Sequence, residues 1–278
     1  MACECKKVDE SDFCKDVAHP GWDDPILGTA YSTFPADQKM GPCVFIACLS
    51  AVGWVWPLVT EPFKCRNASG TDAHGIRTYT IPFRFPQATY PVEEKVALNA
   101  GSYCYSHSKN LKELWVALYE KAYVKKLTGG NKCDSYLNTP FPVTPMDPLK
   151  HITGYNGNSE LVSANIYGKI TDKCYKNKTK YATVVWSLNH AYTVLGYMVS
   201  GGTEYLVLRD PTNANAFIRN DIIENTNWEI EDHFYWNPAT GRQGGRGALV
   251  VTLSNGIFAL KHDKVKDYFQ GAAWSGPV

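Results

Sequence analysis

Cys43 stands where a cysteine could act as a nucleophile. It follows Gly41-Pro42 and opens the apolar run 43–56, which predicts a buried helix ended by Pro57. Proline is favoured in the first helical turn, and the dipole and free amides of a helix N-terminus stabilise a negative charge. Cys43 could therefore work as a thiolate, or it could be a buried structural residue. Cys48, which lies deeper in the same apolar run, is expected to be such a structural residue.

A histidine and an acid in the second half of the chain could complete such a site. His190 opens the apolar segment 191–199, whereas the other six histidines lie in polar or loop-like surroundings. Asp210 ends the next apolar segment, where its carboxylate could accept the second imidazole proton and hold the ring. These residue types indicate acyl transfer through a thioester, and a metal site would need more ligands.

Helices are predicted for the first half of the chain. Besides 43–56, helical spacing relates Leu111, Leu114, Trp115, Leu118 and Ala122, with Asn110 and Glu113 as a cap and Gly129-Gly130 as the end. Between these helices, the alternating residues 78–85 predict a strand or hairpin.

The second half is predicted to consist mainly of antiparallel strands. Four prolines in the segment 138–148 indicate a linker without regular structure. Strands are expected at 181–186, 191–199, 204–209, 248–253 and 257–260, with a hairpin turn at 200–202. Arg209 is expected to be a charge at the surface or at a strand end.

These patterns divide the chain into three parts. We expect an N-terminal arm (1–42), a helical subdomain that carries the cysteine (43–137) and a β-rich subdomain that carries the histidine and the aspartate (138–278). A chain of 278 residues is long enough for one large core or two modest ones of about 140 residues each, and we expect two domains.

Composition and charge exclude several classes of protein. Hydrophobic residues make up 44% of the chain and charged residues 20%, as in an ordinary soluble globular protein. The net charge is +1 and no block of basic residues stands out, so nucleic acid is not expected as a partner. No apolar run reaches the roughly 18 residues of a membrane span. We expect a monomer that does not insert into membranes.

The cysteines and the N-terminus bear on the cellular compartment. Nine is an odd number of cysteines, which leaves at least one thiol unpaired, and Cys3, Cys5 and Cys14 lack zinc-site spacing. The first residues contain no apolar signal region, so we expect a cytoplasmic protein. Secretion is the alternative if a signal was removed before residue 1, and the acceptor triplets at Asn67 and Asn177 would suit it.

Four blocks of the sequence resemble the protease core of the calpain family, within the papain-like cysteine proteases. They are GPCVFIACLSAV (41–52), ELWVALYEKAYVKK (113–126), HAYTVLGY with LVLRDP (190–197 and 206–211) and NGIFALKHDKVKDYF (255–269). The resemblance implies an α+β fold with two subdomains, a helical first half and an antiparallel, β-barrel-like second half, separated by a cleft. It also implies an endopeptidase acting on protein or peptide substrates, with Cys43 as nucleophile, His190 as general acid and base, and Asp210 orienting the imidazole.

The chain departs from the family pattern at the orienting residue and at the oxyanion hole. The family's asparagine-proline-tryptophan-glycine motif here reads Asp210-Pro211-Thr212-Asn213. A carboxylate can orient an imidazole as an amide does, and Asn213 is the alternative. The family has a glutamine six residues before the cysteine, where this chain has Asp37. We assign the oxyanion donor to Gln38, one residue later, because an anionic aspartate cannot stabilise an oxyanion.

The resemblance does not carry over the family's calcium sites. Pro42 and Asn255 stand where acidic residues of the calcium loops would be, and hard cations need several carboxylates. We therefore predict a core that needs no calcium and no other cofactor. The alternatives are the same fold acting as a transpeptidase or deamidase, a catalytically silent binding module and, more weakly, a transglutaminase-type fold.

Overall fold

The computed structural model describes residues 4–7, 42–56, 68–99, 102–103, 106, 115–130, 141–142, 144–161, 163, 165–187, 190–212, 219–235, 243–253 and 256–276. Only the backbone is described for the strand residues 4–7, 96–99, 102–103, 231–235 and 243–248. Within these residues the fold is α+β, with most of the helices before the main antiparallel sheet, as predicted. The proposed division at residues 42 and 137 stays a prediction.

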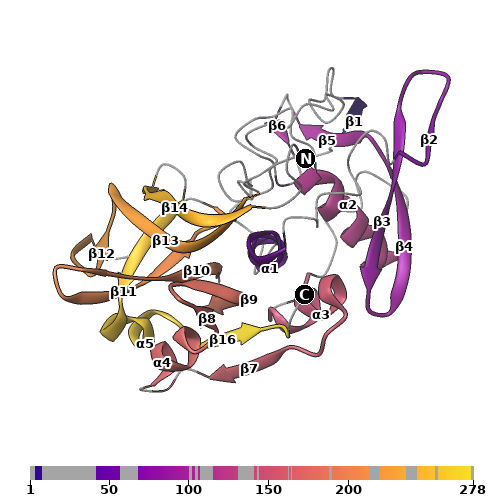
Figure 1. Ribbon diagram of the computed structural model, residues 1–278. Coiled ribbons are helices and arrows are strands. Elements are labelled where there is room, and N and C mark those ends of the chain that lie inside the picture. Colours follow the sequence, from indigo (N-terminus) through magenta and orange to yellow (C-terminus); the bar gives the residue numbers. More distant parts are fainter. Residues whose placement is uncertain are drawn as a thin grey trace.

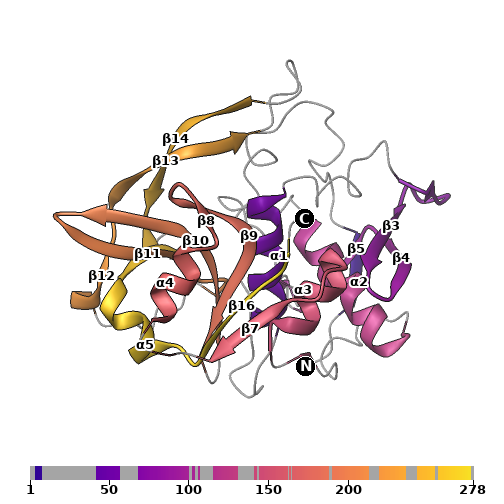
Figure 2. The same cartoon turned by 60° about the horizontal axis from the view of Figure 1, so that its bottom comes forward.

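The apolar run 43–56 forms helix α1 (Cys43–Val55), which lies in the middle of the molecule (Figures 1 and 2). Its residues 43–54 are all buried, as expected for a helix that is apolar on every side. It packs against strands β9 (Lys178–Trp186) and β10 (Ala191–Ser200) and against helices α2 (Trp115–Thr128) and α3 (Met146–Thr153). The helix predicted for 43–56 is confirmed.

The first half of the chain places α2 and a hairpin beside α1. Strands β2 (Gly70–Thr71), β3 (Arg77–Arg84) and β4 (Gln87–Glu93) form one small sheet, and β1 (Glu4–Lys7), β5 (Lys95–Asn99) and β6 (Ser102–Tyr103) form another. Phe45 of α1 stacks on Tyr123 of α2 with ring centroids 4.1 Å apart, and Phe83 of β3 packs on the same tyrosine. The strand predicted for 78–85 is β3, and α2 ends at the predicted glycine, Gly129, in the left-handed region.

The second half is built on an eight-stranded sheet in which every pairing is antiparallel. Its order is β12 (Ile222–Ile223), β15 (Ile257–Lys261), β11 (Thr203–Arg209), β10, β9, β16 (Gly271–Trp274) and β7 (Asn158–Leu161), and β8 (Cys174–Tyr175) pairs with β9. The long strands β13 (Thr226–Tyr235) and β14 (Gln243–Val251) form a separate hairpin. In the described part of the chain the eight-stranded sheet does not close into a barrel.

Most central strands of this sheet are buried on both faces. Val184 and Ala191 belong to the core around α1, whereas Val185 and Tyr192 belong to the core around α4 (Ile166–Thr171) and α5 (Val265–Tyr268). Figure 1 shows α4 and α5 on the side of the sheet away from α1. Burial on both faces explains why these strands read as nearly continuous apolar runs.

The strands predicted at 181–186, 191–199, 204–209 and 257–260 are β9, β10, β11 and β15, and that predicted at 248–253 overlaps the end of β14. The turn between β10 and β11 lies at Gly201 and Gly202, both with positive φ, as the hairpin prediction requires.

The prediction that the segment 138–148 has no regular structure is wrong at its end. Helix α3 begins at Met146 with Pro145 as its N-cap and includes Pro148 in its first turn. The first amides of a helix have no intrahelical acceptor, so proline costs no hydrogen bond there. Helices α3 and α4 and the strands β7, β13 and β16 are not among the predicted elements.

Gly196 lies at an irregularity in β10, at a position that has no room for a side chain. The register of β10 shifts between Val194 and Gly196, and a Cβ at Gly196 would overlap the Asn177 carbonyl oxygen and lie 2.8 Å from the Trp228 ring. We expect Gly196→Ala to lower the free energy of unfolding by about 2 kcal/mol or more, because backbone cannot move aside as a side chain does. Gly70→Ala, which meets open space, is the matched control in denaturant unfolding. Equal stability of the two variants would contradict this packing.

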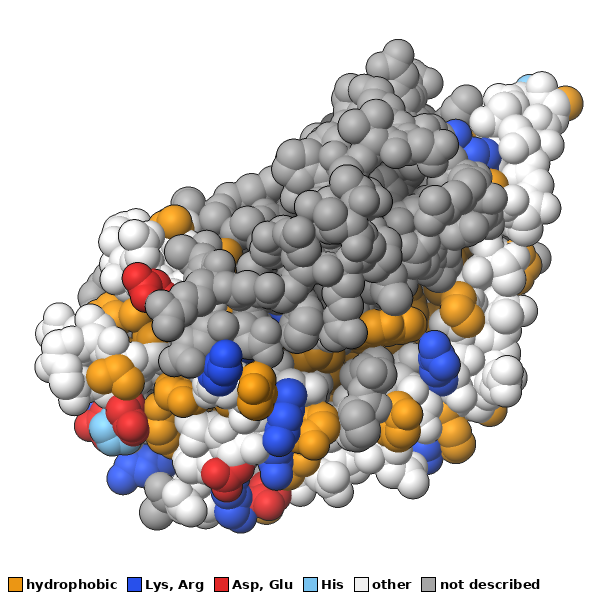
Figure 3. Space-filling view, viewed as in Figure 1, with side chains coloured by type: hydrophobic (Ala, Val, Ile, Leu, Met, Phe, Trp, Pro, Cys, Tyr) orange, Lys and Arg blue, Asp and Glu red, His pale blue; other side chains and the backbone are white. Residues whose placement is uncertain are grey.

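The face seen in Figure 3 shows lysine and arginine side chains interspersed with acidic and hydrophobic ones. The described residues form no continuous patch of one charge on that face. None of the described helices is both long and apolar enough to cross a bilayer.

Candidate active site

Cys43 is the first residue of α1, as its sequence context predicted. Pro42 is the N-cap, and its carbonyl accepts the first helical hydrogen bond from the Ile46 amide at 2.7 Å. The thiol of Cys43 is not in a disulfide, and the residue is 4% exposed. Cys48, deeper in the helix, lies in the core, where burial raises the pKa of its thiol well above the usual value. Of these two cysteines of α1, Cys43 is the one at the helix N-terminus.

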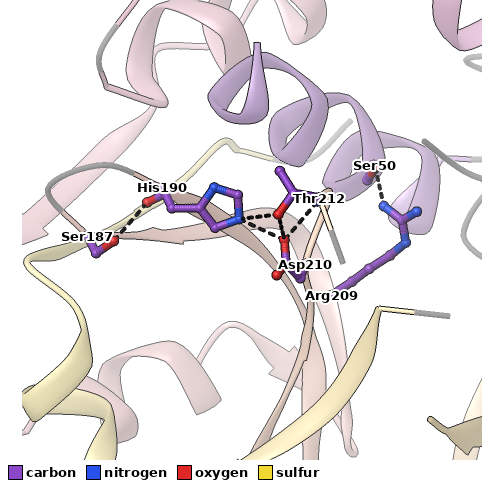
Figure 4. A network of polar contacts seen from close by, with 6 residues as sticks. All are labelled: Ser50, Ser187, His190, Arg209, Asp210 and Thr212. Atoms are coloured by element: carbon purple, nitrogen blue, oxygen red, sulfur yellow. Dashed lines mark hydrogen bonds and ion pairs between the residues drawn. The ribbon is translucent and has the colours of Figure 1, made fainter. Parts of the chain in front are cut away.

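His190 stands at the entrance to β10 and lies between the cysteine and the acid. The Ser187 amide donates to the His190 carbonyl at 2.8 Å, which closes the connection from β9. The imidazole Nε2 lies 2.7 Å from Oδ1 of Asp210, and the imidazole also has a hydrogen bond with Cys43. Figure 4 shows the other ring nitrogen turned toward α1. The fold thus brings together three of the four predicted site residues.

Polar contacts fix α1 against the strands that carry the histidine and the aspartate. The hydroxyl of Thr193 in β10 donates to the carbonyl of Ala47 at 2.8 Å, and Thr193 pairs with Arg209 of β11. Arg209 Nη1 donates to the Ser50 hydroxyl at 3.3 Å. Residues 43, 47 and 50 follow each other along one face of the helix. The face that carries Cys43 is therefore held in register with β10 and β11.

The expectation that Arg209 is a surface charge is wrong, although the residue does end a strand. Its side chain is among the largest that are fully buried, and it extends from the end of β11 to α1 (Figure 4). Because a guanidinium has several donors, it can bind to polar groups of a helix while its stem is covered by apolar neighbours.

The environment of His190 favours the protonated ring. Burial alone lowers its pKa, but the hydrogen bonds to Asp210 and Cys43 and the charges of both groups outweigh it and raise the pKa of His190 to about 9. Burial alone would raise the pKa of Asp210, yet its contacts with His190 and Thr212 leave that pKa below the usual value. At neutral pH the pair is therefore an imidazolium and a carboxylate.

Two further residues touch the imidazole and were missed from the sequence. Tyr192 packs edge-on against the His190 ring with centroids 4.6 Å apart. Thr212 donates to Asp210 Oδ1 from its amide at 2.8 Å and from its hydroxyl at 2.7 Å. The alternation of side chains along a strand could have indicated Tyr192, two residues after His190. Nothing in the local pattern distinguishes Thr212 from an ordinary turn residue.

Other predicted residues lie outside the described part of the chain. They are Asp37 and Gln38 before the cysteine, Asn213 after the acid, and Asn255 of the last block. The oxyanion role of Gln38 and the alternative of Asn213 therefore stay predictions. The interdomain cleft also stays a prediction, because residues 8–41, 188–189 and 213–218 adjoin the three site residues in sequence and are not described.

Among the described residues, no group of three or more His, Cys, Asp or Glu side chains is arranged to hold a metal ion. The predicted independence of calcium is not tested by this arrangement and stays a prediction.

The acceptor triplet at Asn177 is engaged in the fold. The Asn177 side-chain amide donates to the Glu229 carbonyl, and Thr179 is buried with its hydroxyl 3.2 Å from the Leu195 carbonyl. A glycan on Asn177 would replace one of the two hydrogens of this side-chain amide and leave the other for the contact with Glu229. Asn67 of the second triplet lies outside the described residues.

An α+β fold with a cysteine at a helix N-terminus, facing a histidine and an aspartate on antiparallel strands, is consistent with the fold of calpain and papain-like cysteine proteases. Comparison with curated proteins supports the calpain-like family. A thiol protease of Porphyromonas gingivalis is 24% identical over 94% of this chain and 56% of its own length. Calpain-7 of Mus musculus and of Homo sapiens are each 24% identical over 64% of this chain and 22% of their own length.

The chain therefore spans about half the length of the bacterial relative and about a fifth of the calpains. No family model matches the sequence. The relatives support cysteine protease activity for the family, as the sequence motifs predicted.

Proposed function

We propose that the chain is a cysteine endopeptidase that hydrolyses peptide bonds through a thioester acyl-enzyme. The observation that carries this proposal is the position of the His190 imidazole, which has a hydrogen bond with Cys43 and another with Asp210. A nucleophile, a general base and a group that orients the base are the parts that covalent acyl transfer needs. The names of the relatives support the same chemistry.

Acylation uses the protonated histidine. The Cys43 sulfur attacks the carbonyl carbon of the peptide, forming the C–S bond and a tetrahedral oxyanion. The Cys43 amide and the Gln38 side chain are the proposed donors to that oxyanion. When the C–N bond breaks, the imidazolium of His190 gives its proton to the departing amine.

Deacylation uses the neutral histidine that remains. His190 takes a proton from water, whose oxygen attacks the thioester carbon, and the C–S bond breaks to release the carboxylic acid and Cys43. Asp210 stays a carboxylate throughout and holds Nε2–H, so the other ring nitrogen remains directed at the sulfur. We propose that a single copy of the chain performs this cycle without calcium.

Incubation with a disordered protein substrate tests the proposal. We expect cleavage by the wild-type chain, equal rates with and without a calcium chelator, and no cleavage by Cys43→Ala. Cys174→Ala is the matched control, since Cys174 is a described free thiol away from His190 and Asp210. Loss of cleavage with chelator would contradict the calcium proposal alone.

Product masses separate the alternatives that share this fold. Hydrolysis adds one water to each peptide bond cleaved, transpeptidation joins an amine to the acyl group, and deamidation raises the mass of an intact chain by about 1 Da. A wild-type chain that gives no product and no Cys43-specific labelling by an electrophile would instead identify a silent binding module.

A further inference from the structure

Thr212 contacts the proposed catalytic pair more closely than its place in a turn requires. It lies two residues after Asp210, which directly follows the end of β11, and it is half-buried beside His190. Figure 4 shows its hydroxyl beside both the imidazole and the carboxylate. The calpain-like motif read from the sequence has tryptophan at this position, so a hydroxyl here is a departure that accompanies the exchange of asparagine for Asp210.

One oxygen of Asp210 receives all three of these contacts. Oδ1 lies 2.7 Å from Nε2 of His190, 2.8 Å from the amide of Thr212 and 2.7 Å from its hydroxyl. The hydroxyl oxygen also lies 3.4 Å from Nε2. A hydroxyl that donates to the carboxylate keeps lone pairs directed elsewhere, so it can serve as a weaker second acceptor for the imidazolium proton.

We propose that Thr212 is a positioning residue that fixes Oδ1 of Asp210 against Nε2 of His190. This inference rests on the proposed function for its effect on turnover, but its effect on the imidazole does not require that function. A free carboxylate can rotate about its last bond, and two donors from one residue restrict that rotation. The imidazole ring is then held with its other nitrogen toward Cys43.

The Thr212 hydroxyl could orient the Asp210 carboxylate or share its negative charge, and these two roles predict opposite changes in the pKa of His190 when the hydroxyl is removed. A hydroxyl that donates to Oδ1 shares its negative charge, so its loss would strengthen the attraction to the imidazolium and raise the pKa of His190. If the hydroxyl instead holds Oδ1 in place, its loss lets the carboxylate turn away, and the pKa of His190 falls. Among the described residues, the other groups that face the imidazole are Cys43 of α1 and Tyr192 of β10. Tyr192 remains neutral because burial raises the pKa of its hydroxyl.

The test compares Thr212→Val with Thr212→Ser in the full-length chain. Valine keeps the shape and the backbone amide but removes the hydroxyl, whereas serine keeps the hydroxyl. Thr171→Val is the matched control, since the half-buried Thr171 hydroxyl donates to the Gly168 carbonyl in α4, away from the site. The pKa of His190 is measured by NMR titration of the imidazole carbon-bound protons, assigned with His190→Gln, and kcat and KM are measured on a peptide substrate.

We expect Thr212→Val to lower the pKa of His190 and to lower kcat about tenfold with KM unchanged, the size expected for one hydrogen bond to a charged group. Thr212→Ser should restore both, and Thr171→Val should change neither. An unchanged or raised pKa of His190 in Thr212→Val overturns the proposal. If the wild-type chain has no protease activity but the pKa still falls in Thr212→Val, the positioning role holds and the proposed function fails.

Discussion

Replacing either Cys43 or His190 by alanine should remove nearly all turnover. We expect kcat/KM to fall by roughly 10⁴-fold or more in each single variant, because each substitution removes the covalent route for peptide cleavage. The double variant should be no slower than the single ones, since two residues that act as a unit are not additive. Steady-state kinetics with a fluorogenic peptide provide the measurement.

His262→Ala is the control for this pair of substitutions. His262 is exposed, lies beyond the end of β15 and has its ring near Tyr167, so its loss should leave kcat/KM unchanged. If the loss of kcat/KM in the double variant, relative to wild type, equals the product of the two single-variant losses, Cys43 and His190 act independently. That result would contradict the hydrogen bond between them as a working part of the site.

The negative charge of Asp210 should set the alkaline limit of activity. The protonated form of His190 is populated below its raised pKa of about 9, so wild-type activity should persist to about that pH and then fall. Asp210→Asn keeps a hydrogen-bond acceptor but removes the charge. We expect its alkaline limb to move down by about one to two pH units, because a neighbouring opposite charge shifts a pKa by that much.

The pH dependence of kcat/KM in the two proteins checks this prediction. Activity of Asp210→Asn near pH 7 should be partly retained, whereas Asp210→Ala, which removes the acceptor as well, should lower kcat by roughly 10²-fold or more at every pH. Asp263 is an exposed carboxylate in the short helix η7 (His262–Lys264), and Asp263→Asn should leave the profile as it is. If the alkaline limb is identical in wild type and Asp210→Asn, the charge of Asp210 does not raise the pKa of His190, and the prediction is contradicted.

The parts of the site that the sequence predicted are those with a strong local signal. Cys43 is marked by the start of an unusually apolar helix, and His190 and Asp210 by the ends of buried strands. Their meeting could not be read from spacing, because it depends on the packing of α1 against β9 and β10. The resemblance to a known family supplied that link.

The parts that the sequence missed depend on tertiary contacts. Arg209 looks like an ordinary strand-end charge until α1 provides the Ser50 hydroxyl beside it. Thr212 looks like a turn residue until Asp210 folds back onto its amide and hydroxyl. Pro148 appeared to break regular structure, because proline inside a helix is rare, yet the first turn of α3 accommodates it.

The fold shows the same division between local and tertiary information. The predicted central strands were confirmed because burial on both faces makes each of them a continuous apolar run. Strand β7 is mostly polar and the apolar run of β16 is only four residues long. They form because β16 pairs with the edge of β9 and β7 pairs with β16. Neighbouring strands, rather than propensity, specify them.

The rate of Cys43 alkylation by iodoacetamide at pH 6 tests the central claim most directly. If Cys43 and His190 share a proton across the contact between α1 and β10, wild type should react at least about tenfold faster than His190→Gln, with Cys174 as the internal reference thiol. Peptide mapping by mass spectrometry gives the rate at each cysteine. Equal rates at Cys43 in the two proteins would contradict the account.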